Sequence, residues 1–93
     1  MGMGYALKED IRFNNGEILN ENFDTYEIPR FSWLPKIETY IIDDKNSDPQ
    51  GGGEPAIVVM GAVLANAIYD AVGVRVFQMP MTAERVKAAI QKG

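Results

Sequence analysis

The chain has 93 residues, 46% of them hydrophobic, and a formal net charge of −4, so it suits one small domain and is too apolar for global disorder. The negative charge argues against an electrostatic nucleic-acid binder, because such proteins cluster Lys and Arg on one face. Cysteine and histidine are both absent, which excludes a disulfide, a thiolate metal site and a Ser-His-Asp triad built from this chain alone. The lack of cysteine also fits a cytoplasmic protein.

The chain opens on an apolar, glycine-spaced run, Met1 to Leu7, with no capping residue before it. Ala6 to Glu9 favour helix, so the run reads as the interior of an element whose beginning is missing. Asn14, Asn15 and Gly16 then predict a hairpin turn, since Asn-Gly readily adopts positive φ. The expected arms of this hairpin are residues 11–13 and 17–19.

The middle of the chain is mostly irregular. Asn20 to Pro35 has aromatic residues and two prolines but no clear period, so we expect an ordered loop. Ile37 to Ile42 is rich in β-branched residues and predicts the best strand of the chain. Asp43 to Gln50 is polar and predicts a loop.

The longest apolar run, Ala56 to Val72, predicts a helix that begins at Pro55 or the next residue and ends before Gly73. Its apolar residues cover most of the circumference, so we expect protein on every side of it. The run is slightly short for a bilayer and lacks flanking anchors, which favours a buried soluble helix over a membrane span. Asn66 and Asp70 form its one polar stripe.

The last segment predicts a short strand, Val74 to Met79, and a helix, Ala83 to Gln91, capped by Thr82. Short strands beside three helices give an α+β fold class, with a long buried helix after a Gly-rich loop. Residues 1–93 are then a single domain or a fragment of a larger one. The two long irregular loops favour the fragment.

Three ligand motifs match only in part. Gly51, Gly53 and Ala56 satisfy the dinucleotide pattern G-x-G-x-x-[GA], yet eight residues separate them from the predicted strand, and Glu54 would repel a phosphate. A P-loop is excluded, because no lysine follows the glycines.

The third partial match is to a calcium-binding EF-hand loop. Asp44, Asn46 and Asp48 fit its positions 1, 3 and 5, but Pro49 and Pro55 stand where Gly and Glu are required. A solvated loop is the simpler interpretation of these acidic residues.

The segment Gly51, Gly52, Gly53, Glu54 and Pro55 is the most distinctive stretch. Three glycines without Cβ atoms leave room for a bulky ligand, and a carboxylate at a helix entrance stays ionised, which suits a general base. The simpler alternative is an acid that only complements the helix dipole. No second acid, histidine or nucleophile stands beside Glu54, so a catalytic Glu54 needs a cofactor or another chain.

These residues resemble the C-terminal end of the molybdopterin-binding large subunit of the xanthine dehydrogenase and aldehyde oxidase family. That family shows a G-x-G-E-P motif, then N-A-[IV]-x-[DE]-A-x-G, then P-[LM]-T, here at Gly51 to Pro55, Asn66 to Gly73 and Pro80 to Thr82. Met1 to Glu9 is similar to the family's Q-G-x-G-x-A-L-x-E helix, with Met1 in place of the Gln. The resemblance runs through nearly the whole chain in order.

The resemblance implies a molybdenum hydroxylase that oxidises aldehydes or N-heterocycles. It implies that Glu54 is the base that deprotonates a hydroxyl on molybdenum, and that Gly51, Gly52 and Gly53 lie along the molybdopterin. It also implies partners: the rest of the molybdenum subunit, and iron–sulfur and possible FAD domains or subunits. Gln50 departs from the Lys that the family often has there.

A complete molybdenum subunit is several times longer than this chain. We therefore expect the chain alone neither to hold molybdopterin firmly nor to turn over, and to self-associate through Phe31, Trp33 and the Met-rich N-terminus. Two alternatives remain open: a non-catalytic interaction or structural module derived from that family, and a small nucleotide-binding domain.

Overall fold

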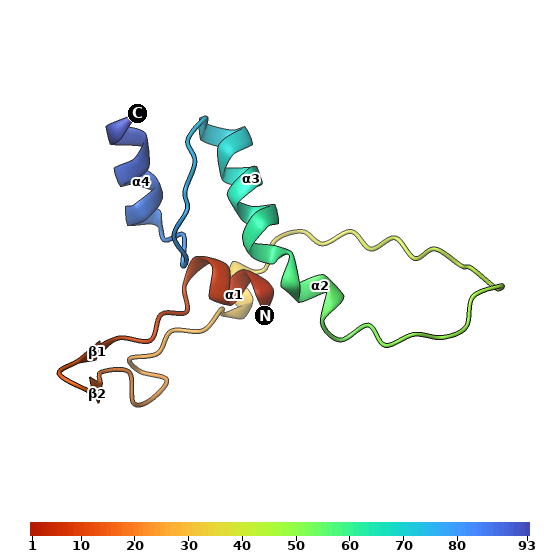
Figure 1. The fold of residues 1–93 in the computed structure, drawn as a ribbon, viewed down its shortest axis with the longest axis horizontal. Helices are drawn as coiled ribbons and strands as arrows, with labels where there is room; N and C mark the ends of the chain where they lie inside the picture. The colour runs from red at the N-terminus through yellow and green to blue at the C-terminus, as the bar shows by residue number, and fades with distance from the viewer.

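The computed structural model describes residues 1–93 and contains four α-helices, one 3₁₀ helix and a two-stranded antiparallel sheet. The elements, in chain order, are α1 (Gly2–Leu7), β1 (Phe13–Asn14), β2 (Glu17–Ile18), η1 (Phe31–Trp33), α2 (Pro55–Val58), α3 (Met60–Val72) and α4 (Ala83–Lys92). In Figure 1 the hairpin and the long loop before α2 extend to opposite sides of α1, while α3 and α4 rise from it. The α+β class predicted from the sequence is confirmed.

The hairpin forms where the Asn-Gly signal predicts it. Asn15 and Gly16 adopt φ of 49° and 85°, and Phe13 pairs with Ile18 across the turn. Positive φ at both central residues matches the right-handed twist of a two-residue hairpin. Its arms are only two residues each, shorter than predicted, and every residue in them is exposed.

The small core lies where α1 meets the segment before α4. Ala6 is fully buried, Met81 is 3% exposed, and the Met81 amide donates to the Ala6 carbonyl at 2.7 Å. Gly4 is also buried, and a side chain there would collide with Glu9 and Pro29. The helix predicted near the N-terminus is present as α1, although it ends at Leu7, before Lys8 and Glu9. Helices α2 and α3 and the segment before α4 contact it.

The predicted helix over residues 55–72 is present but interrupted at Val59, which separates α2 from α3. Gly73 ends α3 in the left-handed conformation, with φ of 75°, as its sequence position predicts. Close to the break, α1 crosses the helix at Gly2, where an added Cβ would collide with the Met60 side chain. A glycine is needed at this crossing because the Met60 and Ile57 side chains occupy the space that a Cβ would fill.

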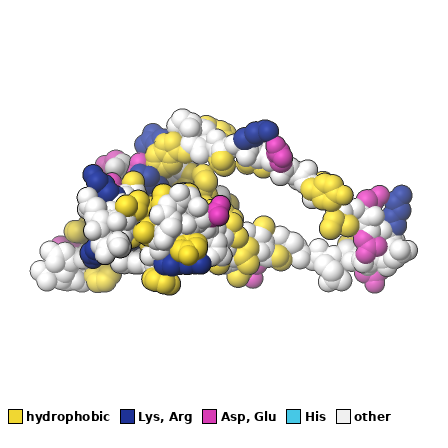
Figure 2. Space-filling view, turned by 90° about the horizontal axis from the view of Figure 1, so that it is seen from above, with side chains coloured by type: hydrophobic (Ala, Val, Ile, Leu, Met, Phe, Trp, Pro, Cys, Tyr) yellow, Lys and Arg dark blue, Asp and Glu magenta, His cyan; other side chains and the backbone are white.

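The prediction that this helix is buried is wrong: neither α2 nor α3 contains a buried residue. The whole chain exposes 8181 Å². A compact protein of this mass would expose roughly 5,400 Å². The radius of gyration of 16.8 Å likewise exceeds the value of about 12 Å expected for a compact chain of this length. The chain therefore lacks the mass needed to surround an all-round apolar helix, and Figure 2 shows apolar side chains over the visible surface.

The two predicted strands at Ile37 to Ile42 and Val74 to Met79 are also wrong, since neither segment is in a strand. A strand needs a neighbour to satisfy its backbone N–H and C=O groups. These segments have none in this chain, so β-propensity alone does not form a ladder.

The last helix confirms its predicted cap. Thr82 is extended, and its hydroxyl oxygen accepts a hydrogen bond from the Arg85 amide at 3.3 Å. Arg85 also donates to the Pro80 carbonyl at 2.6 Å, which fixes the start of α4 against the preceding segment.

One helical stretch, Pro55–Val72, is long and apolar enough to cross a membrane, with a mean hydropathy of 1.7 over 18 residues. By length and composition the run is therefore not too short for a bilayer, contrary to the expectation from the sequence. A core helix of a larger soluble protein meets the same criterion.

Candidate functional site

The predicted site residues lie at the end of the long loop that enters α2. Gly51, Gly52 and Gly53 are exposed, and a Cβ added at any of them would meet no atom within 4 Å. Gly2 and Gly61 differ, because an added Cβ there collides with a methionine side chain. Packing within this chain thus explains the helix glycines and does not explain the three glycines of the loop.

Glu54 occupies the N-cap position of α2, and its carbonyl accepts from the Ile57 amide at 2.9 Å and the Val58 amide at 3.1 Å. Its side chain makes no capping hydrogen bond, forms no ion pair and is exposed. The backbone of Glu54 is therefore held in the helical turn, while the carboxylate stays available to an external group.

A groove of about 670 Å³ lies beside Gly53. Its walls come from the start of α1, from the segment before the long loop and from the first turns of α2 and α3; they include Met1, Gly2, Leu34, Ile37, Ala56 and Met60. The groove brings the N-terminal glycine motif and the Gly51 to Pro55 motif together, although about fifty residues separate them in the sequence. This proximity was not predicted from the sequence.

The residues present fit one edge of an organic cofactor site. The three loop glycines expose bare backbone beside a mostly apolar groove, and Glu54 adds one ionisable group. No group of three or more acidic side chains is close enough to hold a metal ion directly.

The hypothesis of a dinucleotide-binding site lacks the strand that it requires before the glycines. That fingerprint requires a strand that leads directly into the glycines. The residues before Gly51 form an irregular loop, and the nearest predicted strand, Ile37 to Ile42, is absent.

The carboxylate of Asp44, in the acidic loop, is hydrogen-bonded to residues of the same loop. It accepts hydrogen bonds from the Ser47 hydroxyl and from the Asn46 amide at 2.9 Å. These bonds, the Ser47 hydroxyl first, hold the pKa of Asp44 below its ordinary value. The arrangement is a local turn that stabilises the loop.

Sequence reasoning missed Tyr5, whose hydroxyl donates to the Ile57 carbonyl. Tyr5 and Gly2 are three residues apart in α1 and hence share one face of the helix. A sequence signal could have identified Tyr5. Glycine spacing permits a close helix crossing, and an aromatic residue with a hydroxyl on the same face can then reach the crossing helix.

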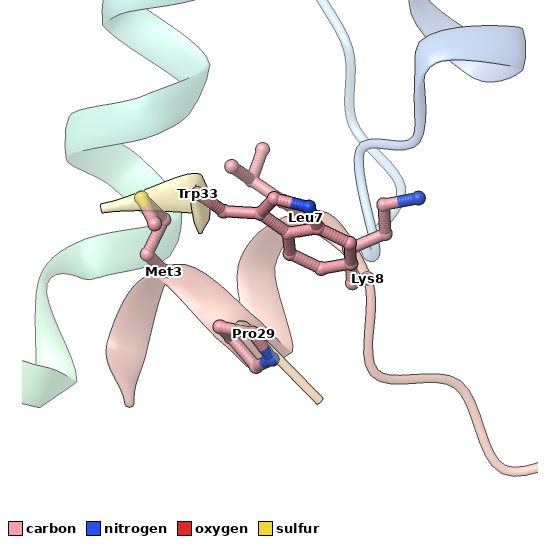
Figure 3. Close-up of a pocket in the computed structure, with 5 residues that line it drawn as sticks. All are labelled: Met3, Leu7, Lys8, Pro29 and Trp33. Atoms are coloured by element: carbon pink, nitrogen blue, oxygen red, sulfur yellow. The ribbon is translucent and has the colours of Figure 1, made fainter. Parts of the chain in front are cut away.

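A second pocket, of about 390 Å³, is lined by Met3, Leu7, Lys8, Pro29 and Trp33. Figure 3 shows the Trp33 ring beside Leu7 and Lys8. The Lys8 ammonium lies 5.1 Å from the centre of this ring and 3.5 Å from a Glu27 carboxylate oxygen. Trp33 is thus partly covered by its own chain, whereas Phe31 is 93% exposed.

No family model matches the chain. Curated relatives are found over most of its length. It is 39% identical over 85 residues to a nicotinate dehydrogenase subunit of Pseudomonas putida, a match that covers 91% of this chain and 7% of that relative. It is 36% identical over 93 residues to the aldehyde oxidoreductase molybdenum-binding subunit PaoC of Escherichia coli K12, which covers 92% of this chain and 13% of that relative.

A further relative is the xanthine dehydrogenase molybdenum-binding subunit of Escherichia coli O157:H7, 32% identical over 92 residues that cover 92% of this chain and 12% of the relative. The chain therefore spans roughly a tenth of the length of these proteins. Their names describe subunits, and two of the three are named as molybdenum-binding.

Proposed function

Since the chain belongs to the molybdenum-binding subunits of the xanthine and aldehyde dehydrogenase family, over the segment that it shares with them, we propose that it is a C-terminal segment of such a subunit. In this proposal the intact subunit oxidatively hydroxylates an aldehyde or an N-heterocycle, and the present chain contributes one part of the site. Only the contribution of this segment is proposed, because most of each relative lies outside the match.

The observation that supports this proposal best is the unpaired carboxylate of Glu54. Its carboxylate has no partner in the chain, and it follows three glycines that packing within the chain does not explain. An unpaired carboxylate at a helix entrance can accept a proton from a bound group. In this proposal Glu54 is the general base, and Gly51, Gly52 and Gly53 admit the cofactor to the backbone.

The residues fit a molybdopterin site at this edge, and the bound molybdenum cofactor would supply the oxidation–reduction chemistry. The chain's own contribution is a bare glycine backbone, an apolar groove wall and one proton acceptor. A chain without cysteine provides no thiolate ligand for an iron–sulfur centre. In this proposal the iron–sulfur partners, and FAD where the assembly has it, would lie on other domains or subunits.

We further propose that the 93-residue chain alone is inactive. The loop glycines are open on all sides, and most of the surface around Glu54 is exposed. A cofactor that contacts only this edge would be bound weakly, since ligand sites normally bury most of the ligand surface.

The decisive variant is Glu54→Gln, made in the intact molybdenum-binding subunit. Gln keeps the shape of Glu but cannot accept the proton, so we expect kcat to fall by a factor on the order of 10² to 10⁴ with normal molybdenum content. The matched control is Glu84→Gln, which removes another exposed acid from the first turn of a helix, α4. Turnover by Glu54→Gln close to that of Glu84→Gln would contradict the proposal.

The alternative is a non-catalytic interaction or structural module from the same family. The observation that favours it is the apolar exposed surface of α2 and α3, which contain no buried residue. Under this alternative Glu54→Gln changes only stability, and only slightly, so the same experiment separates the two functions.

A further inference from the structure

We infer that Tyr5 is a positioning residue for Glu54, an inference that rests on the proposed function. Its hydroxyl is part-buried and donates a hydrogen bond to the Ile57 carbonyl, 52 residues away in the sequence. This is the one side-chain hydrogen bond of the chain that reaches the turn carrying Glu54. Tyr5 acts on that turn through the backbone and does not itself contact a reacting atom.

The connection from Tyr5 to Glu54 is a chain of two hydrogen bonds. Ile57 accepts from Tyr5 at its carbonyl and donates from its amide to the Glu54 carbonyl at 2.9 Å. The Val58 amide also donates to the Glu54 carbonyl, at 3.1 Å. The Ile57 and Val58 amides lie in the same short turn as Glu54. A hydrogen bond that holds Ile57 in place therefore also holds the backbone from which the Glu54 carboxylate projects.

This turn needs an external anchor. Helix α2 is four residues long, three glycines precede its N-cap, and Val59 interrupts the helix behind it. A single helical turn is unstable in isolation, since nucleation orders several residues for one hydrogen bond. Three adjacent glycines also give the loop more conformational freedom than any other residues would. Without the contact to α1, little in the chain would hold Glu54 in one orientation.

Helix α1 is suited to provide that anchor. Gly2 lies against Met60 and Ile57, close enough that an added Cβ would collide, and this close crossing brings Tyr5 within reach of Ile57. At its other end α1 is held by Ala6, which is fully buried and accepts from the Met81 amide at 2.7 Å. The anchor therefore connects the site to the best-buried part of the chain.

The test is Tyr5→Phe in the intact molybdenum-binding subunit, because Phe keeps the ring and removes only the hydroxyl. Hydrogen exchange, followed by mass spectrometry, reports the turn independently of activity. We expect the Ile57 and Val58 amides to exchange roughly three- to tenfold faster, the loss expected for one hydrogen bond. We also expect kcat to fall by a similar factor while KM changes less than about twofold and molybdenum content stays normal.

The matched control is Tyr26→Phe, which removes another tyrosine hydroxyl that donates to a chain acceptor, the Glu9 carboxylate at 2.6 Å. It should leave exchange at Ile57 and Val58 and the value of kcat unchanged. The inference is overturned if Tyr5→Phe leaves exchange at this turn unchanged, or if Tyr26→Phe changes kcat equally. Full turnover in Glu54→Gln would instead overturn the proposed function, so the two failures are distinguishable.

Discussion

At the scale of single residues, the candidate site depends on two side chains with different proposed roles, Glu54 and Tyr5. Glu54 offers an unpaired carboxylate, and Tyr5 holds the turn from which that carboxylate projects. Local chemistry made several residues predictable from the sequence, because the Asn15 turn, the Gly73 terminus and the Thr82 cap depend on near neighbours alone. Tyr5 was not predictable, since its partner is 52 residues away.

Tyr26 gives a prediction about pH. The hydrogen bond to Glu9 raises the pKa of Tyr26 above its ordinary 10.0, with burial and the Glu9 charge adding to the rise. A raised pKa in the folded state means that the contribution to stability is present below pH 10 and is lost as pH rises through the raised value. Glu9→Gln should return the pKa of Tyr26 toward 10.0, as measured by the ultraviolet absorbance of tyrosinate. Tyr26→Phe identifies the signal, and an unshifted titration in Glu9→Gln would disprove the pairing.

At the scale of elements, the capped helix α4 and the tight hairpin were predictable, whereas the strands predicted at Ile37 to Ile42 and Val74 to Met79 are absent. Ile37 to Ile42 has strand propensity but no neighbouring strand, so it stays unpaired and outside any strand. The interruption at Val59 was missed because it coincides with the crossing of α1, where Gly2 and Tyr5 contact the helix. Sequence periodicity describes a helix by itself and contains no information about such a crossing.

Helix α4 provides a test at this scale. Thr82→Ala removes the oxygen that accepts from the Arg85 amide, and we expect the free energy of unfolding to fall by about 1 kcal/mol. Urea unfolding of the intact protein measures the change. Thr82→Ser retains the oxygen and should keep most of the stability; an Ala variant as stable as the Ser variant would show that the cap contributes nothing.

At the scale of the whole molecule, the chain is open. Only 4 of 93 residues are buried, and Tyr40, Phe31 and Phe77 are each more than 90% exposed. The expectation of a buried apolar helix failed for the same reason, since the surface that would cover it is not in this chain. The α+β class and the location of the glycine loop were predictable, while the open arrangement around them was not.

The exposed apolar surface predicts self-association of the 93-residue chain by itself. Burying side chains such as Phe31, Phe77 and Ile41 between copies removes apolar area from water. Sedimentation equilibrium should show an average mass well above 10.3 kDa that rises with concentration. A single monomeric species at high concentration would refute this expectation.

Whether this chain works as a segment of a molybdenum-binding subunit can be measured on the native polypeptide. An antibody raised against residues 1–93 captures that polypeptide from its source, and its mass and molybdenum content are measured together. We expect a polypeptide several times larger than 10.3 kDa that contains molybdenum. A native polypeptide near 10.3 kDa without molybdenum would contradict it and would leave the glycine loop and Glu54 without the cofactor that the proposed function requires.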